Sequence, residues 1–218
     1  MKNIMRSLKN KSVKNFLVIP CARQTIDAFI EHWHYSKNVN GIKTDYCFKL
    51  CDGTTMIGAM MYGKLSMAEV WKKYVKEEKD LLELRRLCCI DDTPKNTESY
   101  FIGATLKWLK KNTSVKKIIS YADTTYNHNG TIYKATNFKH LGFTKAGKVI
   151  FYNDKLYHDK TIRTKYNGQL KPFALKILNA LKSGQAKYIN TKPKHIYLIS
   201  LIRKKNFVPN NYQYGLFV

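Results

Sequence analysis

The sequence predicts an α/β fold in which a mixed central sheet carries helices on both faces. Two apolar runs suited to buried strands, residues 84–90 and 118–122, each end in a polar turn that leads into a helix-like segment. The chain has 218 residues, of which 44% are hydrophobic, so it can bury a substantial core. In open α/β folds binding sites lie where such strands end, and polar residues gather there in this sequence.

The first half of the chain alternates polar and apolar segments in a regular way. Residues 26, 29, 30 and 33 are apolar at helical spacing, and Asp52-Gly53 is a hairpin signal between two β-rich runs. The expected elements are a flexible basic arm at 1–15, a strand at 16–19 ended by Pro20, a helix at 24–33, paired strands at 46–50 and 56–62, and a charged helix at 67–78.

The second half begins with the two buried strands and continues with weaker patterns. Asn153-Asp154 marks another hairpin, and Ser183-Gly184 ends an amphipathic segment. The expected elements are strands at 84–90 and 118–122, helices at 97–111 and 130–139, a hairpin of 147–152 with 155–157, a helix at 172–181 and a strand at 194–202.

Charge is the dominant compositional feature. The formal net charge is +24, and residues 1–26 and 160–218 contain no Asp or Glu. Lysine and arginine in such excess indicate an anionic partner, because they neutralise phosphates and release counterions. A surface that only confers solubility is the alternative. The acids lie in the middle of the chain, which favours a basic rim around a mixed-charge centre.

Cysteine usage and hydropathy restrict the environment of the protein. The five cysteines include no Cys-x-x-Cys pair, which is typical of free thiols in a reducing compartment. No signal peptide is recognisable and no apolar run approaches twenty residues. We therefore expect a cytoplasmic protein without a membrane partner.

Asp123 and Tyr133 are candidate catalytic residues. Asp123 directly follows the strand sequence IISYA, and a carboxylate there can accept a proton or orient an amine, with burial moving its pKa toward the working range. Tyr133 lies in GTIYKATNF and can act as a general acid or an orienting donor. The alternatives are a helix-capping aspartate and a core tyrosine.

Arg86 and the following loop are candidate anion-binding elements. In an alternating strand Arg85 and Arg86 point to opposite faces, so one can reach an anion. Two surface arginines are the alternative. The loop DTPKNTES leads into a helix whose expected N-cap is Thr97, and helix N-termini bind phosphates. This loop predicts a cradle for a cofactor phosphate or a backbone phosphate, and its candidate binding residues are Lys95, Asn96 and Ser99.

Three further features remain open at this level. His34 and Tyr62 end a helix and a strand, and Tyr62 fits either base stacking or the core. A metal site of His34, Asp123 and His128 matches no known ligand spacing, so any metal is unknown. The basic and aromatic residues of 187–205 suit phosphate contact with occasional stacking, or a solvated face.

The blocks ELRRL, KNTES, SYAD and HNGTIYKATNF, in this order, resemble the phage Mom family of DNA adenine-modifying proteins. The match covers roughly residues 34–143, with weaker support from KPKHIYLISL. The family is a divergent relative of the GNAT acyltransferases, and its members add a carbamoylmethyl group to the 6-amino group of adenine, which protects phage DNA from restriction. The resemblance implies that Arg86, Asp123 and Tyr133 are important for activity, and Tyr62 and His34 also match.

Two differences from ordinary GNAT enzymes concern the donor. Those enzymes bind the pyrophosphate of acetyl-CoA with a glycine-rich loop, whereas the equivalent stretch here, CIDDTPKNTES, contains no glycine. Their usual acid tyrosine corresponds to Phe138, so Tyr133 would have to act from another position. The resemblance allows an acetyl-CoA-type donor, but the cofactor is unknown.

These observations lead to one main hypothesis. The expected protein is a GNAT-like transferase that modifies adenine in double-stranded DNA, with the target base flipped out, in the host bacterial cytoplasm if the gene is phage-encoded. The alternatives are a non-catalytic basic DNA-binding protein and a conventional N-acetyltransferase of a protein or small amine. The expected organisation is an arm at 1–15, a GNAT-like core at 16–160 and a basic extension at 161–218 packed on it. The oligomeric state is open, with a homodimer as one option.

Overall fold

A computed structural model describes residues 8–67, 69–126 and 128–201. The chain divides into two compact units. The larger unit comprises Met1–Tyr121, Gly130–Leu141 and Ile196–Val218, and the smaller comprises Ala122–Asn129 and Gly142–His195. The expected organisation into an arm at 1–15, a core at 16–160 and a packed extension at 161–218 stays a prediction.

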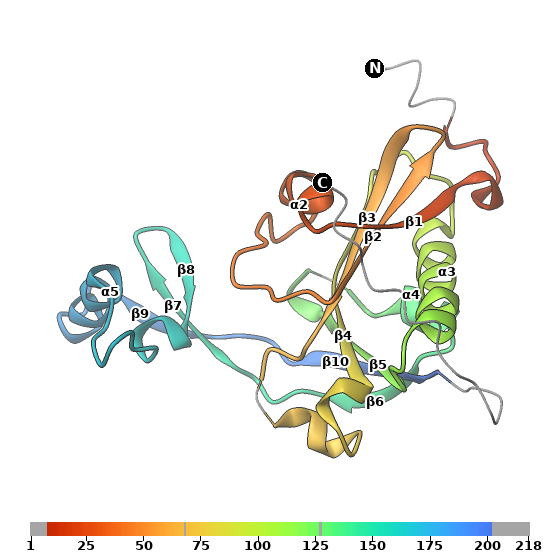
Figure 1. Ribbon diagram of the computed structural model, residues 1–218. Helices are drawn as coiled ribbons and strands as arrows, with labels where there is room; N and C mark the ends of the chain where they lie inside the picture. The colour runs from red at the N-terminus through yellow and green to blue at the C-terminus, as the bar shows by residue number, and fades with distance from the viewer. Residues whose placement is uncertain (1–7, 68, 127, 202–218) are drawn as a thin grey trace. The chain divides into compact units, whose positions relative to one another are not determined.

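The main sheet has seven strands in the order β1-β2-β3-β4-β5-β10-β6 (Figure 1). Neighbours from β1 to β4 are antiparallel, whereas β4 and β5 are parallel. This confirms the predicted mixed sheet. The strands are β1 (Leu17–Cys21), β2 (Tyr46–Asp52), β3 (Thr55–Gly63), β4 (Leu81–Cys89), β5 (Lys117–Asp123), β6 (Lys139–Phe143) and β10 (Lys194–Ser200).

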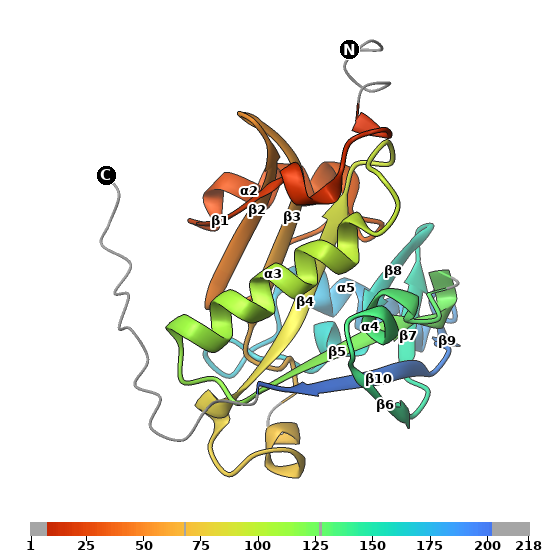
Figure 2. The same cartoon turned by 90° about the vertical axis from the view of Figure 1, so that its right-hand side faces the viewer.

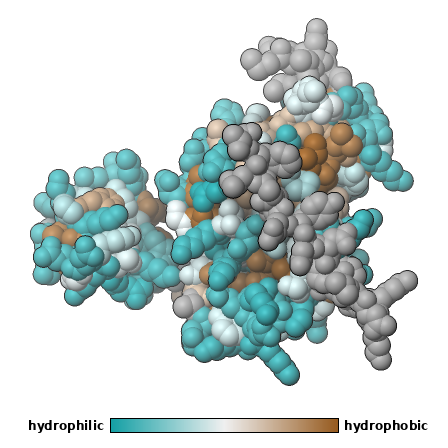
Figure 3. All heavy atoms as spheres, viewed as in Figure 1, coloured by the Kyte–Doolittle hydropathy of each residue, from teal (hydrophilic) through white to brown (hydrophobic). Residues whose placement is uncertain are grey.

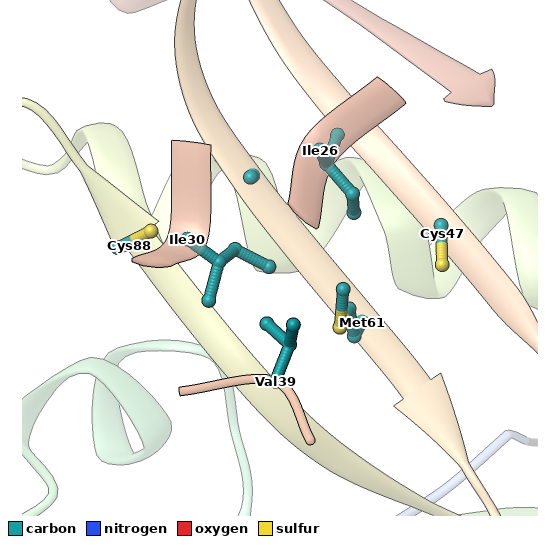
Figure 4. Packing of buried hydrophobic residues seen from close by; sticks show 7 residues of the cluster. Ile26, Ile30, Val39, Cys47, Met61 and Cys88 are labelled. Atoms are coloured by element: carbon teal, nitrogen blue, oxygen red, sulfur yellow. The ribbon is translucent and has the colours of Figure 1, made fainter. Parts of the chain in front are cut away.

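Helix α2 (Gln24–Trp33) covers one face of this sheet. Its apolar stripe buries Ile26 and Ile30 completely, as the helical spacing of these residues predicts. They pack with Val39 and with side chains from β2, β3 and β4, which are Cys47, Ala59, Met61 and Cys88 (Figure 4). This cluster fixes α2, and with it the loop that follows the helix, against the centre of the sheet.

Helix α3 (Thr97–Asn112) covers the other face. Its Thr105 hydroxyl meets Tyr62 of β3, and its Trp108 ring packs edge-on against Phe48 of β2 at 5.2 Å between centroids. Helices therefore lie on both faces of the sheet, as predicted.

Strands β4 and β5 pair only where they begin. Their register runs from Leu81–Lys117 to Glu83–Ile119, although both strands continue, and they diverge in Figure 2. Beside this point the pairing of β3 with β4 shifts, because Met61 faces Arg86 and Tyr62 faces Leu84. Arg85 is the extra residue of this bulge, and bulges re-aim side chains next to functional sites. The hydrogen-bonded ladder of the sheet is thus interrupted between β4 and β5, beside the bulge that precedes Arg86.

The smaller unit has its own sheet, in the order β8-β7-β9. It comprises β7 (Lys148–Tyr152), β8 (Lys155–His158) and β9 (Lys187–Asn190), and helix α5 (Pro172–Lys182) packs on one face. Ile150 of β7 is completely buried against Ile177 and Ala180 of α5. The predicted hairpin and helix are confirmed, but β9 was not expected from the sequence.

Two predicted helices are wrong or shortened. The described residues of 67–78 form no α-helix, since Glu69 adopts a left-handed conformation (φ 67°) and this part of the chain shows instead the 3-10 turns η2 (Val70–Lys73) and η3 (Glu78–Asp80). The helix expected at 130–139 is reduced to α4 (Thr131–Ala135), because left-handed Gly130 precedes it and left-handed Asn137 follows it.

The described part of the expected N-terminal arm packs on the larger unit. Leu8 is buried, and the Lys11 ammonium donates a hydrogen bond to the Asp52 carboxylate at 2.6 Å. Residues 1–7 lie outside the described residues. All five cysteines are free thiols, as expected. None of the helices in the described residues combines the length and apolar character that crossing a membrane requires.

Candidate active site around two buried tyrosines

Tyr62 is the first buried tyrosine of the site. It is completely buried near the end of β3, and its hydroxyl lies 2.7 Å from the Thr105 hydroxyl. Thr105 donates its single hydroxyl hydrogen to the Ile102 carbonyl at 2.9 Å, so Tyr62 is the donor in the pair. Burial raises the pKa of Tyr62 well above its usual value, so this phenol stays protonated.

Tyr133 is the second buried tyrosine and comes from α4. Burial raises the pKa of Tyr133 to about 12, although a hydrogen bond with Ser120 acts in the opposite direction. Ser120 in turn donates to the Leu84 carbonyl of β4 at 3.3 Å. Tyr62 and Tyr133 are close enough for their phenols to interact electrostatically. Both hydroxyls are therefore proton or hydrogen-bond donors at neutral pH, and neither is a base.

Gly130 determines where Tyr133 lies. It begins α4 with φ at 74°, a conformation that favours glycine. A Cβ atom on Gly130 would lie 2.1 Å from the ring of Tyr197, which stacks on Tyr133 at 5.2 Å between centroids. Only glycine allows the chain to pass this ring and place Tyr133 in the core.

Arg86 enters the site from β4 beside the bulge. Its Nη1 donates to the Arg85 carbonyl at 2.8 Å and its Nη2 to the Asn38 carbonyl at 3.3 Å. Its Nε is buried and has no hydrogen-bond partner among the described residues. Burial lowers the pKa of Arg86, while Tyr35 acts to raise it. A buried guanidinium N–H without an acceptor is costly, so this group fits an acceptor supplied by a ligand.

Arg85 has a different environment from Arg86. Its Nη1 donates to the Lys64 carbonyl at 2.8 Å, and the same atom lies 3.7 Å from the Glu83 carboxylate. The two neighbouring arginines thus reach different partners, but the bulge at Arg85 interrupts the alternation on which the prediction of opposite faces rested. Only Arg86 retains an N–H group that is buried and unpaired among the described residues.

His34 lies buried just after α2. The backbone N–H of Ser36 donates to its Nδ1 at 3.1 Å, so the neutral ring carries its proton on Nε2. The rings of His34 and Tyr35 stack at 4.1 Å between centroids. Tyr35 interacts electrostatically with both Arg86 and Tyr133, and it connects His34 with them.

Four of the predicted residues thus lie in the larger unit, but on two faces of the sheet: Tyr62 meets α3 through Thr105, whereas Arg86 and His34 lie with the loop after α2. Tyr133 interacts electrostatically with Tyr62 and with Tyr35 of that loop. Three other residues of the site were not predicted from the sequence: Tyr35, Thr105 and Ser120. Ser120 lies in the sequence block SYAD, but a serine within a buried strand gave no sign of a hydrogen bond to a distant tyrosine.

Asp123 belongs to the smaller unit. Burial acts to raise the pKa of Asp123, but hydrogen bonds from Lys194 at 2.7 Å and from the Thr125 backbone N–H at 3.0 Å outweigh it, and the pKa is lowered. The expectation that burial moves this pKa toward neutrality was wrong. The group is a carboxylate suited to accepting hydrogen bonds and a weak proton acceptor.

The loop before α3 differs from the expected phosphate cradle. Asn96, with φ at 71°, is the N-cap residue, and Thr97 is the first helical residue, with its hydroxyl donating to the Pro94 carbonyl. The Thr97 prediction was therefore wrong. Ser99 donates its hydroxyl to the Asn96 carbonyl at 3.0 Å, and Lys95 is exposed.

Charge in this loop opposes a diphosphate. Three carboxylates, Asp91, Asp92 and Glu98, lie in or next to it, and one of them pairs with Lys9 at 3.0 Å. These residues fit the pyrophosphate of an acetyl-CoA-type donor poorly. The assignment of Lys95, Asn96 and Ser99 to a donor site stays a prediction.

Metal ligation finds no support in the described part of the chain. It contains no group of three or more His, Cys, Asp or Glu residues placed to hold a metal ion. His34, Asp123 and His128 thus form no such group.

Comparisons with known proteins give one family and one fold. The sequence profile of the Mom protein family matches residues 15–214. The methylcarbamoylase mom of Escherichia phage Mu is 28% identical over 147 residues, which are 64% of this chain and 59% of that protein. The match thus spans about three fifths of this relative's length. The crystal structure of Arabidopsis thaliana NAA60 in complex with acetyl-CoA superposes with a TM-score of 0.50 and 10% identity, covering 85% of this chain and 98% of NAA60. That likeness shows a GNAT fold.

Proposed function

Because the chain belongs to the Mom protein family, we propose that it is a transferase that adds a carbamoylmethyl-type group to the 6-amino group of adenine in DNA. The profile match over residues 15–214 is the observation that carries this proposal. The methylcarbamoylase of phage Mu supports it as a relative. The modification would protect phage DNA from restriction.

The substrate would be double-stranded DNA with one adenine flipped out. The 6-amino group of adenine takes part in base pairing and cannot be reached inside the stack, so an enzyme that reacts with it extrudes the base. The net charge of +24 supports a polyanionic substrate, because lysine and arginine neutralise backbone phosphates.

The reaction needs a donor of hydrogen bonds and an acceptor for protons. The adenine nitrogen forms a bond to the carbon of the transferred group, the bond from that carbon to its leaving group breaks, and the proton that leaves the nitrogen passes to solvent water. The Tyr133 phenol, whose pKa is about 12, would donate a hydrogen bond or proton to the leaving group. The donor itself is unidentified.

Arg86 would bind a carbonyl or anionic oxygen of the donor. Its Nε is buried and has no partner among the described residues. Tyr35 interacts electrostatically with Arg86 and also with Tyr133. A charge-assisted hydrogen bond in a buried place is worth more than one in water. Tyr62 and His34 would position this group, since Tyr62 anchors the centre of the sheet to α3 through Thr105.

Asp123 would orient the amine by accepting one of its N–H hydrogens. Its lowered pKa keeps the carboxylate ionised, which suits an acceptor of hydrogen bonds. This role comes from the family resemblance.

Mass spectrometry of nucleosides separates this function from its alternatives. DNA from cells that express the protein is digested to nucleosides and compared with DNA from cells that carry an empty vector. The proposal predicts a modified deoxyadenosine that is heavier by one carbamoylmethyl substituent. A DNA-binding protein without chemistry leaves all nucleosides unchanged. A conventional N-acetyltransferase leaves DNA unchanged but acetylates protein or small amines in the same cells.

A further inference from the structure

The smaller unit carries an unusual excess of positive charge. Ala122–Asn129 and Gly142–His195 together contain twelve Lys and Arg residues against three Asp, a formal net charge of +9. The described ion pairs of this unit engage Arg163 and Lys194. Nine exposed lysines have no ion pair recorded within the described residues: Lys145, Lys148, Lys155, Lys165, Lys171, Lys176, Lys182, Lys187 and Lys192.

The sheet of this unit has two unlike faces. Residues directly opposite each other in antiparallel strands share a face, and the faces alternate along each strand. Ile150 lies opposite Tyr157 and Tyr188, on the face that packs against α5. The other face, here called the outer face, consists of two rows across the sheet, which are Leu156, Phe151 and Lys187, and His158, Val149 and Ile189.

The outer face is apolar at its centre and open. Leu156 is 63% exposed and Ile189 is 38% exposed, whereas Ile150 on the opposite face is completely buried. The Lys187 ammonium lies 5.9 Å from the centre of the Phe151 ring. Figure 3 shows mainly hydrophilic residues on the visible side of this unit, with apolar ones among them. A surface that serves only solubility needs no exposed leucine and isoleucine between lysines.

We infer that the outer face is the docking surface for duplex DNA, with Phe151, Leu156 and Ile189 against sugar and base edges and the surrounding lysines on phosphates. This inference rests on the proposed function, which makes DNA the substrate. Charge complementarity selects the occupant: a second copy of a unit with a charge of +9 would be repelled, whereas each phosphate carries the opposite charge. Apolar side chains next to base steps are a recurrent feature of proteins that grip deformed DNA.

The salt dependence of binding tests the lysines. The full chain and its variants are titrated with a fluorescent duplex at several salt concentrations. Lys187→Gln neutralises the lysine that lies in the outer-face rows, opposite Phe151. Lys107→Gln on α3 makes the same charge change at an exposed lysine of the larger unit and is the matched control. Each phosphate contact contributes about 0.9 to the slope of log K against log salt concentration. We expect Lys187→Gln to reduce this slope by roughly one and the control to leave it unchanged.

Leu156→Ser tests the apolar centre. An apolar contact releases no counterions, so this variant should weaken binding several-fold at every salt concentration with an unchanged slope. Leu17→Ser in β1 replaces a leucine of similar exposure, 57%, in the larger unit and should bind like the wild type. Thermal unfolding of both variants checks that the fold is intact.

The outcomes separate this inference from the proposed function. Equal effects of Lys187→Gln and Lys107→Gln, or an unchanged affinity in Leu156→Ser, would overturn the outer face as the docking surface. A change of sedimentation in Leu156→Ser without a change in DNA affinity would assign the face to a second copy instead. Nucleoside mass spectrometry on the same proteins is the second measurement. If the wild-type protein modifies adenine but the outer-face variants bind DNA normally, the inference is wrong and the proposed function stands. If the protein binds DNA through the outer face but no modified adenine is found, the proposed function is wrong and the docking surface stands.

Discussion

Tyr62 and Tyr133 lie in the same neighbourhood, but their hydroxyl groups have different partners. Tyr62 donates to Thr105, whose own hydrogen is used by a helix carbonyl, so this phenol is held within the protein. Tyr133 has a hydrogen bond with Ser120 of β5, at a position where β5 no longer pairs with β4. Tyr133 is therefore the phenol better placed to act on a substrate.

Replacing Tyr133 with phenylalanine should abolish or strongly reduce adenine modification. The ring and its packing remain, so the free energy of unfolding should fall by only about 1 kcal/mol, as for one lost hydrogen bond. Tyr100→Phe in α3 is the matched control, because the Tyr100 hydroxyl also donates one hydrogen bond, to the Phe16 carbonyl at 3.0 Å. It should lose similar stability and keep activity. Equal modification by both variants would remove Tyr133 from the mechanism.

Asp123→Asn should reduce modification and destabilise the protein in a pH-dependent way. The folded pKa of Asp123 lies below its ordinary value of 3.8, so the carboxylate contributes stability above pH 3.8 that is lost as pH falls through the lowered pKa. Urea unfolding at a series of pH values should show the wild type more stable than the variant at pH 7, with a difference that shrinks below pH 3.8. A difference that grows on acidification would contradict the ion pair with Lys194.

At the level of elements, the sequence predicts best where local chemistry decides the conformation. The helix at Gln24–Trp33 follows from one apolar stripe, and the hairpin of β2 and β3 follows from Asp52-Gly53, whose glycine has φ at 58°. The helix expected at 67–78 does not form, although its residues have helical propensity. The left-handed Glu69 interrupts it, and the buried Asp80 pairs with Lys116 at 2.7 Å. Such tertiary contacts are invisible to propensity.

The start of α4 offers a test of how an element places a catalytic side chain. Gly130→Ala should destabilise the protein by several kcal/mol and lower the modification level, because a Cβ there would meet the Tyr197 ring and φ is positive. Gly103→Ala is the control, since no atom lies within 4 Å of its Cβ position inside α3, and it should be neutral or stabilising by about 0.5–1 kcal/mol. Thermal unfolding measures both. Equal stability of the two variants would contradict the close packing of Gly130.

At the level of the whole molecule, the sequence predicted the fold. Four of the residues implied by the family resemblance, Tyr62, Tyr133, Arg86 and His34, lie in the larger unit, and their roles in activity stay predictions. Their neighbours Tyr35 and Ser120 could not be predicted. Tyr35 is placed by the loop after α2, and Ser120 lies in β5 just beyond the point where β5 stops pairing with β4. Neither feature has a sequence signature.

The division of the chain into two units also escaped prediction. The smaller unit combines Ala122–Asn129 with Gly142–His195, so its segments are not contiguous and no linker marks them. Its surplus of lysine was visible in the sequence, but its outer face depends on β9, which has four residues and no strong pattern. The basic composition thus becomes a defined surface only in the structure.

The central claim is that this chain modifies adenine in DNA with Tyr133 in the mechanism. Its most direct test is mass spectrometry of nucleosides from the DNA of cells that express the wild type, Tyr133→Phe or Tyr100→Phe. We predict a deoxyadenosine carrying one added carbamoylmethyl-type substituent with the wild type and Tyr100→Phe, and its loss with Tyr133→Phe. Unmodified deoxyadenosine in all three samples, with the wild-type protein folded and abundant, would contradict the account.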